Sequence, residues 1–391
     1  MGIKNYLKEL KQENITIHRN YDIFIIDCNY LIHYLIYNCT NDDELKSKTN
    51  NFIKYLFDWV TIKKQLHLVF DGEYDKIYDT NPKLETQNKR MQNVNNESYD
   101  KQEISPKSRI IQFFKDSLIK TVGSYISPFK QQFSVIVNDD YVDGEADIKI
   151  MNIIGGKTKD GDGGGVGGGD EDSDRICILS KDTDMILIGY NILLNKTNSC
   201  KFIDVLCNLR PLKIVNVNRL VKKYAIFGSD YLLLLLLMGN DYLPCIGQVN
   251  YKKLINTYKN DFIYIPHQSQ KHLLLPKAPT VPFITKDDII GKRIIEKNKV
   301  NYESLILFIT CYIINTKCKF NHDNITIDRF RDYYNNLIWC LRYYNIINCK
   351  SINECTSIID YTSNKDGCQY IQLESLSKVI NAYNFLYSNN L

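Results

Sequence analysis

The sequence lacks the patterns of a disulfide scaffold, a zinc site and a membrane span. Its 12 cysteines are scattered singly, with no Cys-x-x-Cys pair and no Cys/His cluster at zinc spacing. Its longest apolar run, Leu232 to Met238, is far too short to cross a bilayer. No secretory leader is recognisable at its start. We therefore expect a reduced intracellular monomer, cytoplasmic or alternatively nuclear, with no membrane partner.

The chain also has little net charge and little tryptophan. Its 49 Lys and Arg against 45 Asp and Glu leave +4, too small for a general nucleic-acid coat, so any basic site must be local. Tyrosine is abundant, at 28 residues against 2 Trp, but it accompanies heavy use of Ile, Asn and Lys. That mix is typical of an A/T-rich coding sequence, so the tyrosines are not interpreted as base-stacking platforms in general.

Short apolar runs alternate with helical patterns, which predicts an α/β fold with a mostly parallel twisted sheet flanked by helices. The 391 residues, 44% of them apolar, can bury a sizeable core. Buried strands are expected at 21–26, 66–70, 133–137, 176–179 and 201–205. Helices are expected at 1–11, 30–37, 52–63, 105–119, 144–154, 217–224 and 231–238, with Pro106 early in its helix and Ser229 as a cap.

Three regions follow from this pattern. Residues 1–262 form the predicted α/β core, which carries a glycine-rich insert at 155–169 with nothing to pack. We expect this insert to be dispensable, because no Gly-Lys-Ser/Thr follows it as in a phosphate loop. Residues 263–286, rich in proline, are expected to be a linker, and 287–391 a mainly helical C-terminal region.

Carboxylates recur where the predicted strands end and where the next helices begin. Open α/β sheets bind ligands at this edge, although a single Asp there is commonly a helix cap. A whole set of acids at one edge would repel unless cations held it, and oxygen ligands suit Mg²⁺ or Mn²⁺ rather than zinc. Two such ions are a usual apparatus for phosphodiester hydrolysis. The seven predicted catalytic and metal-binding acids are Asp27, Asp71, Glu145, Asp147, Asp182, Asp184 and Asp241.

Short motifs surround these acids. Asp27 opens Asp-Cys-Asn-Tyr-Leu-Ile-His, which ends at His33, and Asp71 is followed by Gly. Residues 144–151 read Gly-Glu-Ala-Asp-Ile-Lys-Ile-Met, and 239–244 read Gly-Asn-Asp-Tyr-Leu-Pro. Two further motifs are Asp-Thr-Asp at 182–184 and Ser-Pro at 105–106. Together, these motifs resemble those of the Xrn-type 5′→3′ exoribonucleases, within the superfamily that includes flap endonucleases. Asp147 stands where that family has its second Glu.

The resemblance covers the chain to about residue 244 and implies that the seven acids bind two metal ions. A weaker similarity, at 337–344, is to a helix of the family's second conserved region. By resemblance, His33 stacks on a terminal base, the alternative being a core histidine. Lys83, Gln87 and Arg90 repeat the spacing of the family's basic motif and would share one helix face. The resemblance implies a 5′-phosphate pocket there, against the alternative of a solvated loop.

Three functions compete. The resemblance favours an exonuclease that uses Mg²⁺ or Mn²⁺ to degrade single-stranded RNA from a 5′-monophosphate end. A flap-type DNA nuclease is the second, weakened because the segment 246–249 has one glycine where flap enzymes have Gly-x-Gly. An inactive scaffold that binds RNA or protein is the third, and the presence of all seven acids argues against it.

Overall fold

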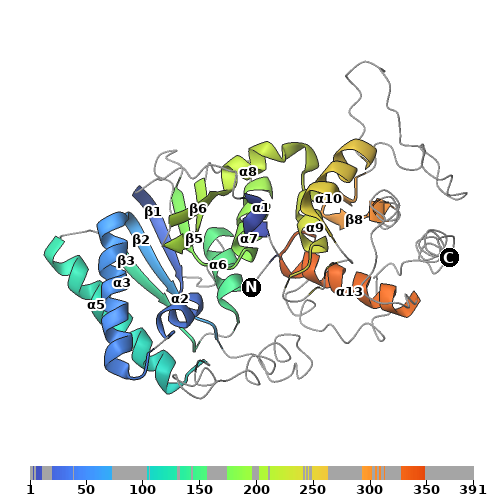
Figure 1. The fold of residues 1–391 in the computed structure, drawn as a ribbon. Coiled ribbons are helices and arrows are strands. Elements are labelled where there is room, and N and C mark those ends of the chain that lie inside the picture. Colours follow the sequence, from blue (N-terminus) through green and yellow to red (C-terminus); the bar gives the residue numbers. More distant parts are fainter. Residues whose placement is uncertain are drawn as a thin grey trace, which may run out of the picture. The chain divides into compact units, whose positions relative to one another are not determined.

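The structure is a computed structural model, and its described residues form two compact units (Figure 1). The first extends from Leu10 to Lys223, and the second combines the N-terminal helix with the chain from Tyr224 onward. The described residues are 3, 6–10, 20–37, 39–72, 104, 106–129, 133–141, 144–155, 174–195, 202–209, 212–240, 243, 245, 249–262, 293–301, 304–305, 308–309, 312 and 327–347. Residue 262, one predicted region boundary, is the last described residue before a gap. Residue 286, the other boundary, and the insert after Gly155 lie outside the described residues.

A six-stranded sheet forms the centre of the first unit, which confirms the predicted fold class. Its strands lie in the order β3-β2-β1-β4-β5-β6, and all neighbours are parallel except the β5–β6 pair. The antiparallel strand β6 was not predicted from the sequence. The strands are β1 (Asn20–Asp27), β2 (Thr61–Val69), β3 (Ser134–Asn138), β4 (Arg175–Leu179), β5 (Phe202–Leu209) and β6 (Leu212–Asn216).

The strand order creates a switch point between β1 and β4. The chain moves outward from β1 to β2 and β3, and then returns to pair β4 with the other side of β1. In register, Asp27 is opposite Val69, and Ile26 is opposite Leu179. The residues that follow β2 and β4 therefore lie at the level of Asp27, where open α/β sheets form their ligand sites.

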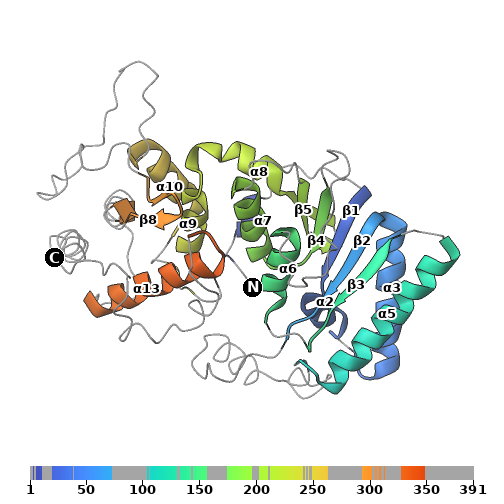
Figure 2. The ribbon, with the colours of Figure 1, turned by 180° about the vertical axis from the view of Figure 1, so that it is seen from behind.

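Helices cover both faces of this sheet (Figures 1 and 2). On one face, Phe24 and Ile26 share a core with α2 (Cys28–Leu35), α3 (Asp42–Trp59) and α5 (Arg109–Phe129). The other face is covered by α6 (Ala146–Gly155) and α7 (Asp184–Asn195), with α8 (Val217–Lys223) beside them. Because both faces are covered, the two central strands carry continuous apolar runs, Ile23 to Ile26 in β1 and Ile176 to Leu179 in β4.

Two predicted helices have different bounds in the structure. The helix expected at 52–63 is α3, which begins ten residues earlier at Asp42 and ends at Trp59, so that β2 starts at Thr61 rather than Leu66. The Asn41 side chain accepts a hydrogen bond from the Glu44 amide, and the Glu44 carboxylate accepts one from the Thr40 amide. This reciprocal cap starts a helix whose first turns are too polar to show an apolar period.

The helix expected at 105–119 is α5, and Pro106 lies before it rather than in its first turn. The Ser108 hydroxyl accepts a hydrogen bond from the Ile111 amide, and the helix then continues to Phe129. Ser229 was expected to cap its helix with its side chain. It precedes α9 (Asp230–Leu237) but makes no side-chain cap bond, because its own backbone is already helical.

The second unit is held by buried polar contacts among aromatic side chains. Tyr231 of α9 shares hydroxyl hydrogen bonds with Tyr6 of α1 (Tyr6–Glu9) and Tyr251 of α10 (Tyr251–Thr257), and the Tyr251 hydroxyl donates to Tyr224. Asp230 accepts hydrogen bonds from the backbone of a small hairpin. The strands of this hairpin are β7 (Ile295–Glu296) and β8 (Lys299–Val300). A further helix of the unit, α13 (Ile327–Tyr343), contacts α9. No helix in the described ranges is both long and apolar enough to cross a membrane.

His67 is a buried titratable group inside the sheet of the first unit. It lies on β2 and makes ring hydrogen bonds with the side chains of Gln65 and Asn138. Burial lowers the pKa of His67 to about 4. The folded protein therefore holds His67 neutral at pH values where an unfolded chain would protonate it.

We expect the free energy of unfolding to fall as the pH is lowered from about 6.5 to about 4. In this window the unfolded state binds a proton at His67 that the folded state does not, so acidification favours unfolding by up to about 3 kcal/mol. Urea denaturation at pH 6.5 and 5 measures the loss for the wild type and for His67→Gln, which removes the titration. Equal losses in the two proteins would show that His67 does not contribute.

Candidate active site

The carboxyl edge of the sheet brings together acids that are distant in sequence. Asp27 is the last residue of β1, Asp71 follows β2, and Asp182 follows β4. Asp71 and Asp182 both lie close enough to Asp27 to interact with it electrostatically. This edge therefore contains the acids predicted from the first, second and fourth strands in chain order.

Asp27 is buried and fixed by two hydrogen bonds. One carboxylate oxygen accepts from the Tyr30 amide at 3.0 Å, which caps α2, and the other accepts from the Ser180 hydroxyl at 2.8 Å. Burial raises the pKa of Asp27 to about 7, with Asp71 and Asp182 adding to the rise while the two hydrogen bonds oppose it. A cation bound at this edge would favour the charged carboxylate.

The turn between β4 and α7 positions the next pair of acids. The Ser180 hydroxyl accepts from the Asp182 amide at 3.1 Å, and the Asp182 carboxylate accepts from the Asp184 amide at 3.0 Å. Asp184 is the first residue of α7 and is buried. Ser180 was not predicted as a site residue, although its position as a polar residue directly after a buried strand could have indicated it. It connects Asp27 to the Asp182 turn.

Asp71 is connected to the start of α6. Its carboxylate accepts from the Ala146 amide at 2.7 Å, and its own amide donates to the Asn29 side chain at 3.4 Å. The adjacent Gly72 amide donates to the Gly144 carbonyl at 2.8 Å. Gly144 has φ +101°, a conformation that favours glycine, so this turn constrains the residue type. Glu145 and Asp147 flank Ala146 and are thereby brought to the side of the edge where Asp71 lies.

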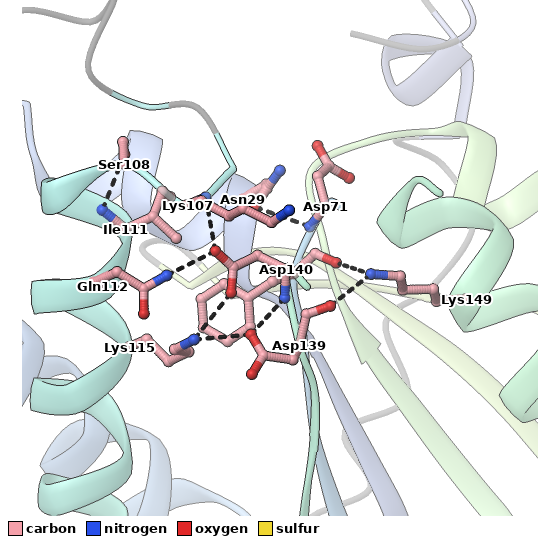
Figure 3. A network of polar contacts seen from close by, with 11 residues as sticks. Asn29, Asp71, Lys107, Ser108, Ile111, Gln112, Lys115, Asp139, Asp140 and Lys149 are labelled. Carbon is pink, nitrogen blue, oxygen red and sulfur yellow. Dashed lines mark hydrogen bonds and ion pairs between the residues drawn. The ribbon is translucent and has the colours of Figure 1, made fainter. Parts of the chain in front are cut away.

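A polar network supports this arrangement from the neighbouring elements (Figure 3). The Lys149 ammonium group of α6 donates to the carbonyls of Phe70 and Asp139, both at 2.8 Å. Phe70 directly precedes Asp71, so Lys149 ties the helix that carries Glu145 and Asp147 to the end of β2. Lys149 lies in the motif at 144–151, but no role was predicted for it, because its partners are backbone atoms of distant segments.

The same network anchors the end of β3 to α5. The buried Asp140 carboxylate accepts from the Lys107 amide, the Gln112 side chain and the Lys115 ammonium group at 2.7 to 2.9 Å. Lys115 also pairs with Asp139 at 2.8 Å. Lys107 has φ +62°, and its hydrogen bond to Asp140 helps to hold that conformation. Asp139 and Asp140 were not predicted, since two acids beyond an edge strand resemble an ordinary turn.

Several predicted residues cannot be placed in this site. Asp241 and the basic residues Lys83, Gln87 and Arg90 lie outside the described residues. His33 is described, and its side chain is exposed on α2, which disfavours the core-histidine alternative. The roles assigned to all of these residues stay predictions.

The donor set of the described acids suits a hard divalent cation. All of the donors are carboxylate oxygens, which fit Mg²⁺ or Mn²⁺. In the described part of the chain, no three or more Asp, Glu, His or Cys side chains lie close enough to one another to hold a metal ion. The geometry thus brings Asp27 near Asp71 and Asp182 without forming a closed coordination shell.

The family comparison identifies one segment of the chain. Residues 73–199 match the family model described as XRN 5'-3' exonuclease N-terminus. The XRN match is shown for this segment. It spans about a third of the sequence and includes β3, α5, α6, β4 and α7, with the acids Glu145, Asp147, Asp182 and Asp184. The resemblance noted in the sequence is confirmed over residues 73–199, the XRN segment.

Other comparisons are more distant. No curated protein shows significant similarity to the sequence. Among solved structures, the catalytic core of Rad2 in complex with DNA substrate is similar at 13% identity and a TM-score of 0.37, over 66% of each chain, just under two thirds. The bacteriophage T5 D15 flap endonuclease, solved with DNA and metal ions, is similar at 10% identity and a TM-score of 0.35, over 94% of this chain and 100% of that one.

We expect Asp182→Asn to leave the first unit folded but to reduce Mn²⁺ affinity, and the nuclease activity that the XRN match predicts, by at least about 10- to 100-fold, the loss typical even of residues that only orient a metal ligand. The amide keeps an oxygen that can accept from the Asp184 amide, yet it removes a charge from the carboxylate edge. The matched control is Asp174→Asn, at the opposite end of β4, where the carboxylate pairs with Lys64. Cleavage rates and Mn²⁺ affinity by titration calorimetry give two readouts. Wild-type values for both in a folded Asp182→Asn protein would refute a metal-binding role.

Lys149→Met is expected to reduce metal affinity or activity by about 10- to 100-fold, because the ammonium group that joins α6 to the Phe70 carbonyl, next to Asp71, is lost. Lys149→Arg should recover part of the loss, since it can still donate to both carbonyls. Lys120→Met, an exposed lysine on α5, is the control. The Mg²⁺ concentration at half-maximal rate distinguishes misplaced ligands from lost stability. An unchanged half-maximal concentration with a lower melting temperature would mean that Lys149 only stabilises the fold.

Proposed function

We propose that the chain is a metal-dependent exonuclease that hydrolyses single-stranded RNA from a 5′-monophosphate end in the 5′→3′ direction. The observation that carries this proposal is the match of residues 73–199 to the XRN 5'-3' exonuclease family. The acids of this segment begin α6 and α7, beside an edge that also carries Asp27 and Asp71. Family and geometry thus support the same chemistry.

The proposed metal ligands are Asp27, Asp71, Glu145, Asp147, Asp182, Asp184 and Asp241. Two bound Mg²⁺ or Mn²⁺ ions would supply an activated water and charge stabilisation for the leaving oxygen. Asp27 is preorganised for binding, because the Tyr30 amide and the Ser180 hydroxyl orient both of its oxygens. Asp71 is oriented in the same way by the Ala146 amide. With such a site, hydrolysis needs no nucleophilic side chain.

Recognition of the 5′ end is assigned to Lys83, Gln87 and Arg90 in the XRN segment. A terminal monophosphate carries more charge than an internal diester, so a small pocket of cationic and amide donors can select it. Arg provides a planar fork for phosphate oxygens, Lys a point charge and Gln an amide donor. The same pocket would exclude a triphosphate or a cap by its size.

The proposal predicts fast decay of 5′-monophosphate RNA and decay at least about tenfold slower for 5′-hydroxyl, triphosphate or capped RNA, because charge-assisted hydrogen bonds to the terminal phosphate are lost or blocked. Matched RNAs labelled at the 3′ end measure both the rate and the direction in the presence of Mg²⁺. Arg90→Ala should reduce the preference while the Mn²⁺ affinity stays unchanged. Arg109→Ala, whose guanidinium pairs with Asp42, is the control.

Two results would contradict this function. Equal rates for 5′-hydroxyl and 5′-monophosphate RNA, or internal cuts that appear first, would reject the exonuclease. Single-stranded DNA and DNA flaps in the same series would reveal a flap-type DNA nuclease instead. A protein that binds these substrates without cutting any of them would support the inactive scaffold.

A further inference from the structure

Helix α2 has an aromatic face that packing does not explain. Its buried side is formed by Cys28, Leu31, Ile32 and Leu35, which belong to the core of the first unit. The other side carries Tyr30, His33, Tyr34 and, just past the helix end, Tyr37. The spacing i, i+3, i+4 and i+7 places these four aromatic side chains on one stripe.

Two tyrosines of this stripe expose their rings to solvent. Tyr34 is 45% exposed and Tyr37 is 68% exposed, whereas Tyr30 is half-buried against the core. The rings of Tyr30 and Tyr34 lie 6.3 Å apart at 37°, so the stripe begins as a contiguous aromatic surface. Exposed aromatic rings concentrated on one helix face are typical of a binding surface.

The stripe starts at the candidate active site. Asp27 caps α2, and its carboxylate accepts the amide of Tyr30, the first aromatic residue of the stripe. At a rise of about 1.5 Å per residue, the four steps from Tyr30 to Tyr34 extend about 6 Å along the helix, and Tyr37 lies just past its end. The helical part alone matches about two stacked bases, which are spaced about 3.4 Å apart along a strand.

We propose that Tyr34 and Tyr37 form a stacking surface for bases of the single-stranded RNA that occupies the carboxylate edge. The inference rests on the proposed function for the identity of the strand. Every base offers a π-face to a tyrosine ring, so such a surface tolerates any sequence but needs unpaired bases. It extends the contact that resemblance assigns to His33 onto two tyrosines outside the motif.

The charges near the stripe favour bases over phosphates as the group that is bound. Lys48 donates a hydrogen bond to the Tyr37 carbonyl, and Asp42, Asp43 and Glu44 open the next helix, where Arg109 pairs with Asp42. The three acids outnumber these two cations, so this side offers no excess positive charge to a phosphate backbone. The contribution of Tyr34 and Tyr37 to affinity should therefore be nearly independent of salt, unlike phosphate contacts.

The test compares a Tyr34→Ala/Tyr37→Ala protein with a Tyr34→Phe/Tyr37→Phe protein. Fluorescence anisotropy measures their affinity for an octa-adenylate RNA with a 5′-monophosphate and a 3′-fluorescein, in EDTA so that hydrolysis is prevented. The alanine variant should bind at least about tenfold more weakly, since each ring stacks on a base, while the phenylalanine variant should bind like the wild type. The loss should have the same size at low and moderate salt, and a perfectly paired RNA duplex should show none.

Phe202→Ala is the matched control, because Phe202 is an exposed aromatic residue at the amino end of β5, on the opposite edge of the sheet. Circular dichroism and the melting temperature confirm folding of each variant. Wild-type affinity of the alanine variant would overturn the proposal, as would equal losses in the alanine and phenylalanine variants. A change from dimer to monomer on size exclusion, without a change in RNA affinity, would assign the stripe to self-association instead.

The outcomes separate this inference from the proposed function. If the alanine variant loses RNA affinity and the wild type cuts no RNA, the stacking surface is retained and the exonuclease is rejected. If the wild type is a 5′→3′ exonuclease and the alanine variant keeps both its affinity and its KM, the exonuclease is retained and the stacking surface is rejected.

Discussion

The parallel pairing of β1 with both β2 and β4 is the constraint on which the rest of the first unit depends. Parallel neighbours place their carboxyl ends at one edge, so Asp27, Asp71 and Asp182 come together although they are far apart in sequence. The same pairing needs helices on both faces, and the helices that follow β1 and β4 begin within a few residues of these acids. Fold and candidate site therefore share one cause.

Bringing carboxylates together has an electrostatic cost that the surrounding structure offsets only in part. Hydrogen bonds from Tyr30 and Ser180 favour the charged form of Asp27, yet burial and the neighbouring Asp71 and Asp182 outweigh them and raise its pKa. The backbone amides at the starts of α2 and α6 contribute as donors to Asp27 and Asp71. Protonation of Asp27 or a bound cation would relieve the remaining repulsion, and among cations the oxygen-only donor set at this edge suits Mg²⁺ or Mn²⁺.

The sequence predicted the parts of this arrangement that are local. An apolar run followed by an acid located the ends of β1, β2 and β4, because burial and strand length determine that pattern. The polar first turns of α3 could not be recognised, since Asn41 and Glu44 start that helix through hydrogen bonds rather than through an apolar period. The contacts of Lys149, Ser180 and Asp140 depend on backbone atoms or side chains from distant segments, which become neighbours only after folding.

Composition also concealed a local pattern. Tyrosine is common throughout the sequence, which favours a compositional explanation for any one of them, and most of the large fully buried side chains of the described residues are indeed tyrosines. On α2 that explanation is insufficient, because the helix has a complete apolar side for the core and still carries aromatic rings on its solvent side. A ring that does not contribute to the core gains no burial energy there, and in the proposed complex it would gain that energy by stacking on a base. The capping bond between Asp27 and Tyr30 places the start of the stripe beside the carboxylate edge, so in the proposed complex the bases next to the bound phosphate are the ones that the tyrosines would contact.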